Sequence, residues 1–405
     1  MSIVKKILYL LNEAERRSAM LLLAMLTLMA LLDTIGIASI LPFMAVLTDI
    51  SVIETNTFVN SLFEISRKLG IKNTEQFLFL LGVLVFILLI LSLSFKALTY
   101  YVQTRFIKLR SYSIGKKLIN GYLNQPYSWF LSQHTADFEK NILSEVDQVV
   151  DFGINSLLEL ISKTLVSLAL IILVLMIDPK LTLIVGFTLS LAYLLIYLFV
   201  KNYLARSGEE RLLNNKLRFI TVSEAFGAIK EIKVRGLEKT YLRSFKVPSR
   251  IFATTQAFAD VISLLPRFFL EAIAFGGVIL LILSLMHQKG NFNDVIPLIS
   301  VYVFVGYRLM PSLQSIYACF ANLAFVEPSL SKLSNDLKNL QATKIYTNKQ
   351  LMPFKEKISL EGIKYYYPNS SRSSINNITL TIPVRSTVGI VGVTGSGKTT
   401  IVDII

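Results

Sequence analysis

The sequence Val391-Gly392-Val393-Thr394-Gly395-Ser396-Gly397-Lys398-Thr399-Thr400 stands near the C-terminal end of the chain and decides how that end folds. It fits the pattern G-x-x-x-x-G-K-[ST] without a mismatch, which is the pattern of a phosphate-binding loop. Gly392, Gly395 and Gly397 have no Cβ atom, so the backbone can turn until successive N–H groups point at one anion. The sequence therefore predicts a phosphate-binding loop.

The side chains around this loop favour a nucleotide. Lys398 adds a cation beside the phosphates, and the Thr399 hydroxyl is a suitable ligand for Mg²⁺. A helix that begins at about Lys398 would direct its positive end toward the phosphates. Upstream, residues 387–391 read Thr-Val-Gly-Ile-Val, an apolar run with β-branched residues that predicts a buried parallel strand. The further predicted nucleotide contacts are Thr394, Ser396 and Thr400.

Composition identifies a membrane protein. The 405 residues are 53% hydrophobic and only 17% charged, and the mean hydropathy is +0.58, well above that of a soluble globular domain. The net charge of +14 does not indicate nucleic acid, because the basic residues fall in loops between apolar segments. The single Cys319 excludes an intrachain disulfide and a multi-cysteine metal site. With His134 and His287 as the only histidines, we expect no histidine-based metal centre.

Six apolar segments are each long enough to cross a hydrocarbon core of about 30 Å, which takes roughly 20 helical residues. Two connections are long, and their parts at 105–140 and 201–250 carry eighteen Lys and Arg residues, against five on the opposite side. By the positive-inside rule, both termini and both long connections are expected to be cytoplasmic. The membrane that we expect is the inner (plasma) membrane of a bacterium, which the charge count does not itself establish. The predicted spans are 19–47, 77–101, 154–177, 181–200, 258–286 and 295–320.

The polar connections are expected to be helical. Residues 201–218 mix leucines with charges, so the membrane helices should continue into the cytoplasm. Apolar residues within 49–76 recur at helical spacing, which indicates either an amphipathic helix on the outer interface or an ordinary packed helix. From Lys357 onward, short apolar runs predict strands. The predicted domains are a membrane domain (1–340), a linker (341–356) and a partial nucleotide-binding domain (357–405).

Six spans, two long helical cytoplasmic connections and a C-terminal phosphate-binding loop resemble the ABC exporter half-transporters, in which a membrane domain is fused to an ATPase domain. The resemblance implies a mainly α, polytopic membrane protein that ends in the β-rich start of a P-loop ATPase domain, with 391–400 as its Walker A sequence. It also implies ATP and Mg²⁺ as cofactors and a second half-transporter, identical or different, as partner. Tyr367, 25 residues before Gly392, stands where the family places the aromatic that stacks on adenine, although Tyr365 and Tyr366 adjoin it.

Two cytoplasmic passages resemble the coupling regions that dock on ATPase domains in this family. They are 125–142, with Tyr127, Trp129 and Phe130, and 223–233, with Glu224, Gly227 and Lys230. The second passage, together with 308–312 in the sixth span, is similar to flippases for lipid-linked oligosaccharides and to related glycan exporters. One departure is Arg385, because the family usually has glycine in the turn before the strand.

Two arginines inside the predicted spans give an independent indication of the cargo. Arg267 lies some nine residues into the fifth span and Arg308 some thirteen into the sixth, so both are well inside the hydrocarbon. An arginine at a span centre costs about 2.5–3.5 kcal/mol, so it needs a partner or a wet cavity. Arg267 either pairs with Glu271 on the same helix face or contacts the substrate. For Arg308 we favour a cavity-facing role over a pair with Glu271 or a lipid headgroup.

Two guanidinium groups at similar depth suit an anionic headgroup such as a pyrophosphate, through forked charge-assisted hydrogen bonds. The sequence therefore predicts export or flipping of an anionic lipid-linked oligosaccharide, with another lipid, a peptide or a drug as alternative cargo. Of the other charges in the spans, Lys96 is expected to snorkel to the interface, and Asp33 has no evident partner nearby in the sequence.

The chain ends at Ile405, before the glutamine loop, signature sequence, Walker B carboxylates and switch histidine that the resemblance implies. We expect no catalytic residue in this chain and no ATP hydrolysis by it alone, because Mg²⁺ lacks a second carboxylate and the attacking water lacks a base. The first hypothesis is a fragment of an ATP-driven translocase built from two such chains. The second is a short form that only binds or assembles, as a non-hydrolysing membrane partner.

Overall fold

The computed structural model describes residues 2–48, 50–68, 73–175, 179–289, 296–341, 354–367 and 370–405. The chain is mostly helical and divides into two compact units, Met1–Gly121 with Thr135–Asn339, and Tyr122–His134 with Leu340–Ile405. The first unit contains α1 (Ile3–Leu10), α2 (Glu13–Ala38), α3 (Ile40–Thr48), α4 (Val52–Thr55), α5 (Thr57–Lys68), most of α6 (Thr74–Leu123), α8 (Thr135–Lys140), η1 (Asn141–Glu145), α9 (Val146–Val149), η2 (Val150–Ile154), α10 (Asn155–Leu175), α11 (Pro179–Gly227), α12 (Ile229–Arg235), α13 (Glu238–Lys289) and nearly all of α14 (Ile296–Gln341). The second contains α7 (Tyr127–Phe130), β1 (Lys357–Tyr365), β2 (Ile375–Pro383) and α15 (Lys398–Ile404).

Four helices are much longer than a membrane is thick. α6, α11, α13 and α14 contain 50, 49, 52 and 46 residues. A helix of 50 residues is about 75 Å long, more than twice the roughly 30 Å of a hydrocarbon core. The prediction that the membrane helices continue well beyond the bilayer is therefore confirmed.

The predicted spans fall in helices α2 and α3, α6, α10, α11, α13 and α14. Within the described residues, four stretches are long and apolar enough to cross a membrane, namely Glu13–Gly36, Thr74–Leu123, Thr135–Ile172 and Leu309–Leu340. The predicted spans 181–200 and 258–286 lie in α11 and α13, where many side chains are outside the described set. The first predicted span is divided between α2 and α3 at Ser39.

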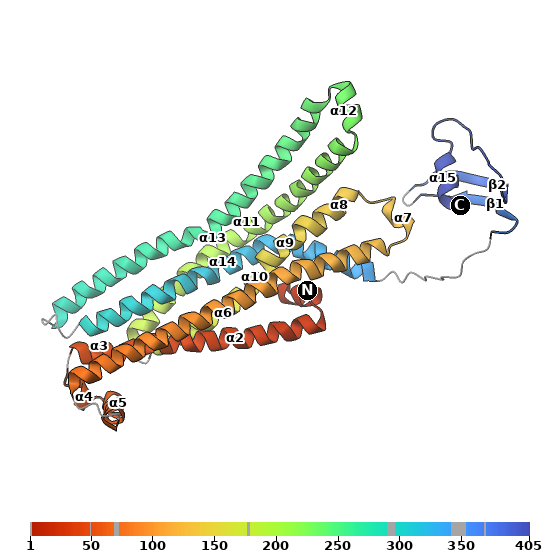
Figure 1. Cartoon of the computed structure of the whole chain (residues 1–405). Helices are drawn as coiled ribbons and strands as arrows, with labels where there is room; N and C mark the ends of the chain where they lie inside the picture. The colour runs from red at the N-terminus through yellow and green to blue at the C-terminus, as the bar shows by residue number, and fades with distance from the viewer. Residues whose placement is uncertain are drawn as a thin grey trace. The chain divides into compact units, whose positions relative to one another are not determined.

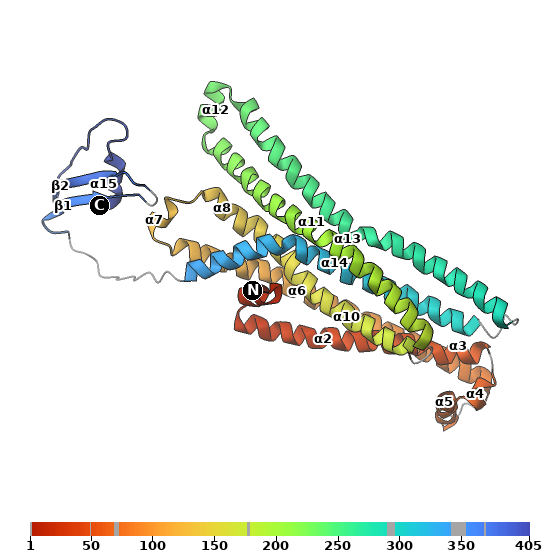
Figure 2. The ribbon, with the colours of Figure 1, turned by 180° about the vertical axis from the view of Figure 1, so that it is seen from behind.

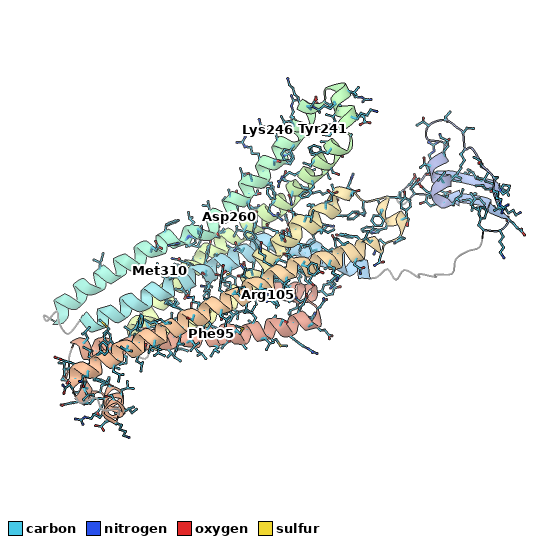
Figure 3. All side chains as sticks on the ribbon, in the orientation of Figure 1. Phe95, Arg105, Tyr241, Lys246, Asp260 and Met310 are labelled. Atoms are coloured by element: carbon cyan, nitrogen blue, oxygen red, sulfur yellow. The ribbon has the colours of Figure 1, made fainter. Side chains whose placement is uncertain are left out.

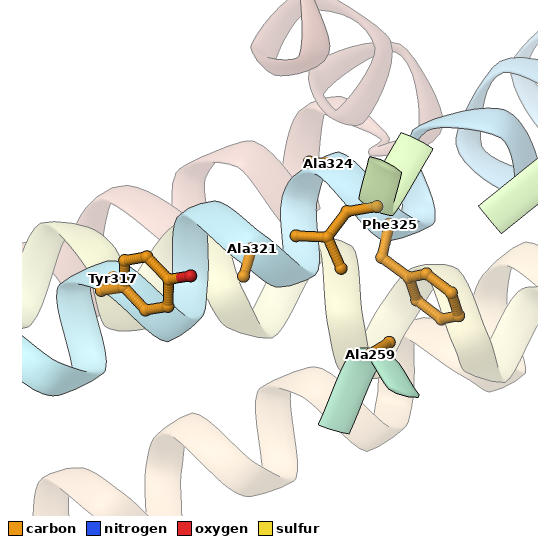
Figure 4. Packing of buried hydrophobic residues seen from close by; sticks show 6 residues of the cluster. Ala259, Tyr317, Ala321, Ala324 and Phe325 are labelled. Atoms are coloured by element: carbon orange, nitrogen blue, oxygen red, sulfur yellow. The ribbon is translucent and has the colours of Figure 1, made fainter. Parts of the chain in front are cut away.

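α11 and α13 lie side by side, and α12 connects them at one end (Figure 1, and Figure 2 from behind). α14 packs against this pair through a buried cluster in which small residues let the helices approach closely (Figure 4). Its buried members are Leu204, Ala259, Tyr317, Ala321, Ala324 and Phe325.

A buried ion pair connects three parts of the first unit. The side chains of Arg211 on α11 and Glu145 in η1 are 1% and 0% exposed and form a salt bridge. The same guanidinium donates to Ser329 Oγ on α14 at 2.7 Å. Asn215, one turn after Arg211, donates to the other Glu145 oxygen at 2.8 Å. Both carboxylate oxygens therefore have donors, as a charge removed from water requires.

Close contact between α11 and α14 occurs one turn before Arg211. A Cβ atom at Gly208 would lie 2.1 Å from the carbonyl oxygen of Phe325 and 3.4 Å from Pro328 Cδ. Because the first of these atoms belongs to the backbone, a side chain at this position would push the two helices apart. Glycine at 208 thus sets the distance at which the buried ion pair forms.

Asp33 has partners that its local sequence does not reveal. It is 5% exposed, Ser92 Oγ on α6 donates to its Oδ1 at 3.3 Å, and Lys96 Nζ lies 3.7 Å from its Oδ2. The expected snorkelling of Lys96 is therefore replaced by an interhelical ion pair. The partners were missed because they lie on another helix, 59 residues further along the chain in the case of Ser92.

The segment predicted to lie on the outer side contains a packed helix, α5. Val59 of α5 is buried in a cluster with Phe77 and Leu81 of α6, and the rings of Phe63 and Phe77 meet edge-on at 5.0 Å. The apolar side of α5 therefore faces protein. The described part of residues 49–76 therefore includes a helix packed on protein, and its position at a membrane interface stays a prediction.

The second unit contains an antiparallel pair of strands, with Leu360 of β1 opposite Leu380 of β2. The predicted strands after Lys357 are confirmed, but the expected strand at 387–391 is wrong. The backbone there is irregular and Val391 is 93% exposed. A strand needs a neighbour for its N–H and C=O groups, and in the described part of the chain β1 and β2 pair with each other.

Replacing Gly208 tests the helix contact. We expect Gly208→Ala to lower the free energy of unfolding by about 1–3 kcal/mol, because the added methyl group overpacks the site. Gly186→Ala is the matched control on the same helix, since a Cβ there meets no atom within 4 Å. Thermal unfolding in detergent should show a lower midpoint for the first variant only, and equal midpoints for both would contradict the contact.

Removing one charge tests the buried ion pair. Glu145→Gln should destabilise the fold by about 3–5 kcal/mol, because the buried Arg211 charge loses its counterion. The control is Asp151→Asn, which breaks a pair whose side chains are 61% and 41% exposed and should change the unfolding midpoint little. The double variant Glu145→Met/Arg211→Met should recover stability, and an unaltered midpoint in Glu145→Gln would show that the pair does not hold the helices.

Candidate functional site

The loop predicted to bind phosphate has a backbone that requires glycine. Gly395 and Gly397 have φ angles of 84° and 86°, a left-handed region that side chains disfavour. A Cβ at Gly397 would also lie 2.8 Å from the carbonyl oxygen of Ser374, and a Cβ at Gly392 would lie 2.7 Å from Ser396 Oγ. The loop is therefore tightly packed at Gly392 and Gly397, and at Gly395 only the backbone angle favours glycine.

Lys398, the first residue of α15, lies over this loop. Its ammonium group donates to the carbonyl oxygens of Gly392 and Val393, both at 2.8 Å. Thr399 is exposed, whereas Thr400 is buried. The structure thus brings together a cation, a glycine loop and an accessible hydroxyl, which fit the phosphates and Mg²⁺ of a nucleotide. Thr394 and Ser396 are exposed on the same loop.

Tyr367 is joined to the helix that follows the loop. Its hydroxyl and Thr400 Oγ1 are 3.0 Å apart, and its ring meets Tyr365 edge-on at 5.2 Å. These contacts hold the half-buried ring at the end of β1 and near the start of α15. Arg385 has a φ of 58°, which explains physically why glycine suits that turn.

The two coupling passages have different structures. In the first, Trp129 of α7 stacks on Tyr122 at 5.9 Å and meets Phe130 edge-on at 5.1 Å, while Tyr127 is 61% exposed. The second passage includes Glu224 and forms the end of α11 together with α12. Trp129 is therefore held in place by its aromatic neighbours, whereas Tyr127 is accessible.

The α12 end of the helix pair carries exposed apolar and basic side chains together. Phe226 and Val234 are 73% and 79% exposed, and Gly227 and Lys230 are exposed beside them. Figure 3 shows Tyr241 and Lys246 near the same end. The pKa of Glu238, the first residue of α13, is lowered at this end of the helix pair. The largest cause is a hydrogen bond that the carboxylate accepts from the Glu238 backbone N–H, and the next is a hydrogen bond from Lys233. Exposed apolar side chains on a polar tip are typical of an interaction surface.

A cavity of about 260 Å³ lies between α11, α13 and α14, and Arg267 lines it. The Arg267 guanidinium donates from Nε to Glu271 Oε1 at 2.7 Å, and the arginine side chain is 52% exposed. The internal ion pair is therefore present, in a residue that also borders a cavity. The side chain of Arg308 lies outside the described residues.

The sequence motifs did not predict the other polar residues of this cavity. Polar side chains within or beside apolar spans are a signal for a functional site, but each of these residues is unremarkable alone. Only the packing of three helices brings them together. They are Tyr193, Ser263, Gln314, Ser315 and Tyr317.

The family model and the similar known proteins all indicate the same family. Residues 19–307 match the model of the ABC transporter transmembrane region. An export ATP-binding/permease protein of Rickettsia bellii is 26% identical over 326 residues, 79% of this chain and 55% of that protein. An alpha-hemolysin translocation ATP-binding protein of Proteus vulgaris is 23% identical, over 78% of this chain and 44% of its own length. An ATP-dependent lipid A-core flippase of Ralstonia nicotianae is 22% identical, over 72% and 49%. The chain spans about half the length of these relatives.

Proposed function

Because this integral membrane chain belongs to the family of ABC transporter transmembrane regions, we propose that it forms one half of an ATP-driven exporter or flippase. The observation that carries the proposal is the glycine loop with Lys398 over it, in the same chain as a membrane domain of this family. A second copy or a related chain would complete the transporter. Both termini, both long connections and the loop would face the cytoplasm, where ATP is present.

The residues of the loop supply the nucleotide contacts. The glycine backbone would bind the phosphates, Lys398 would neutralise their charge, Thr399 would hold Mg²⁺, and Tyr367 would stack on the base. ATP provides the free energy for transport when its terminal phosphate is released. The exposed tip at α12 and the aromatic passage at α7 would receive that change as coupling regions.

The proposed cargo is an anionic lipid-linked oligosaccharide. Arg267 borders a cavity within the helices that form the membrane domain, and its pair with Glu271 leaves the two Nη groups as further donors. A forked guanidinium binds phosphate oxygens with charge-assisted hydrogen bonds. The relatives are described as transporting different cargoes, so the support for this cargo comes from the arginines of this chain.

The nucleotide site is tested with the chain in lipid nanodiscs and a fluorescent ATP analogue with Mg²⁺. Lys398→Ala should weaken binding roughly tenfold or more, because hydrogen bonds to charged groups contribute about 1.5–3 kcal/mol. Gly397→Ala should do the same by changing the loop backbone. Gly389→Ala is the matched control, since a Cβ there meets no atom within 4 Å. Equal affinities of all variants and the wild type would overturn the site.

The cargo is tested in proteoliposomes that contain the transporter purified from its own membranes. Arg308→Gln and Arg267→Gln should each slow ATP-dependent flipping of a pyrophosphate-linked oligosaccharide about tenfold, through loss of a charge-assisted hydrogen bond. Arg243→Gln, an exposed arginine of α13, is the control for loss of charge. If Arg308→Gln flips the glycan at the wild-type rate, or if peptide and dye are transported and the glycan is not, the proposed cargo is wrong.

A further inference from the structure

We propose that the cavity between α11, α13 and α14 is a subsite for a single sugar ring attached to the anionic headgroup of the cargo lipid. The inference rests on the proposed function, which assigns a charged lipid-linked glycan but no place for its sugar. The cavity is lined by residues from three helices that are far apart in the sequence. Tyr193 comes from α11, Ser263 and Arg267 from α13, and Gln314 and Ser315 from α14.

The Tyr193 hydroxyl is the group that most requires a ligand. Its oxygen is buried and has no hydrogen-bond partner among the described residues. Buried hydroxyl groups are almost always hydrogen-bonded, so we expect this hydroxyl to take a partner when a ligand enters the cavity that Tyr193 lines. Gln314 adds an amide with both donor and acceptor atoms and Ser315 adds a hydroxyl. The Ser263 hydroxyl already donates to the Asp260 carbonyl at 2.7 Å and adds an acceptor. A ligand with several hydroxyl groups can satisfy all of them.

The aromatic side of the cavity suits the ring of a sugar. Tyr193 and Tyr317 both line it, with ring centroids 5.8 Å apart and planes inclined by 36°. A sugar ring has hydroxyl groups at its edge and C–H groups on its faces, and a tyrosine likewise combines an apolar face with a polar tip. The lining thus matches both parts of the ring. A plain acyl chain would leave the buried hydroxyl without a partner.

Size and charge restrict the ligand further. A volume of about 260 Å³ lies just below the 300–1,000 Å³ typical of ligand pockets, so it accommodates one ring and not a whole oligosaccharide. Of the ten described residues that line the cavity, Arg267 is the only charged one. The cation at the border and the neutral polar groups elsewhere fit a sugar ring that follows the anionic headgroup of the lipid.

The cavity residues lie close to the predicted cytoplasmic ends of their membrane spans, so the cavity is expected to open toward the cytoplasmic leaflet. Ser263 and Arg267 lie five and nine residues beyond 258, the predicted cytoplasmic end of the fifth span, which corresponds to about 8 and 14 Å along the helix. A lipid headgroup that enters from the inner leaflet would bring its phosphate to Arg267 and its first sugar into the cavity. The pair with Glu271 uses Nε, so both Nη groups remain to donate to the phosphate.

Binding measurements on the chain in nanodiscs test this subsite. One probe is a short polyprenyl phosphate carrying a single sugar, and the other is the same lipid phosphate without the sugar. We expect the wild type to bind the glycosylated probe at least about fivefold more tightly. Tyr193→Phe and Gln314→Leu should each remove this preference without changing the affinity for the sugar-free lipid. Tyr203→Phe, at a 58% exposed tyrosine of the same helix, should keep the preference.

Three results would decide against the subsite or its premise. Equal affinity of the wild type for the two probes overturns the sugar subsite, as does an unchanged preference in both cavity variants. In those cases the proposed anionic lipid cargo is still supported if Arg267→Gln weakens the binding of both probes. Failure of the wild type to bind either probe overturns the anionic lipid cargo itself. The thermal unfolding midpoint of each variant, expected to match the wild type, separates loss of binding from loss of folding.

Discussion

The salt bridge between Arg211 and Glu145 is the constraint on which the packing of the first unit depends. Two charges with almost no exposed surface cannot be separated without leaving one unpaired inside the protein. Their remaining donors and acceptors come from Asn215 and Ser329, so three helical segments must meet in one register. Glu145 also ends a π-helical segment. If that segment relaxed to α-helix, the following residues would rotate by about 100° for each residue of register change, and the carboxylate would leave Arg211.

This register makes α11 and α13 suitable for transmitting motion. α11 runs from the cavity to the α12 end without an internal proline, whereas α13 contains Pro248 and Pro266. Tyr193 and Glu224 on α11 are separated by about 47 Å of helix. A continuous helix moves as a rigid body. A displacement of its exposed tip therefore produces a defined displacement of its other end when a point between the two ends is held in place. Gly208 and Arg211 lie between the two. The buried pair therefore acts as a fixed point for the helix in the proposed transport cycle.

The features that sequence predicts well are those that depend on local chemistry. Hydrophobic segments of about 20 residues give the helices, and a motif of glycines and one lysine gives the loop. The strand at 387–391 was wrong because strand formation depends on a partner, which local propensity does not supply. Asp33 appeared isolated for a similar reason, since Ser92 and Lys96 approach it from a different helix. Pairing across elements is a property of packing and is not encoded in a single stretch of sequence.

The pair between Arg267 and Glu271 bears on how an arginine can serve a cavity in a membrane domain. A lone guanidinium in hydrocarbon is costly, but a paired one is nearly neutral and is held in one orientation. Because the carboxylate accepts from Nε, the fork formed by the two Nη groups can bind a phosphate without first breaking the pair. The ion pair and the substrate contact are therefore compatible. Glu271 lowers the cost of placing the charge, and in the proposed subsite the neutral polar groups around Tyr193 would discriminate between headgroups.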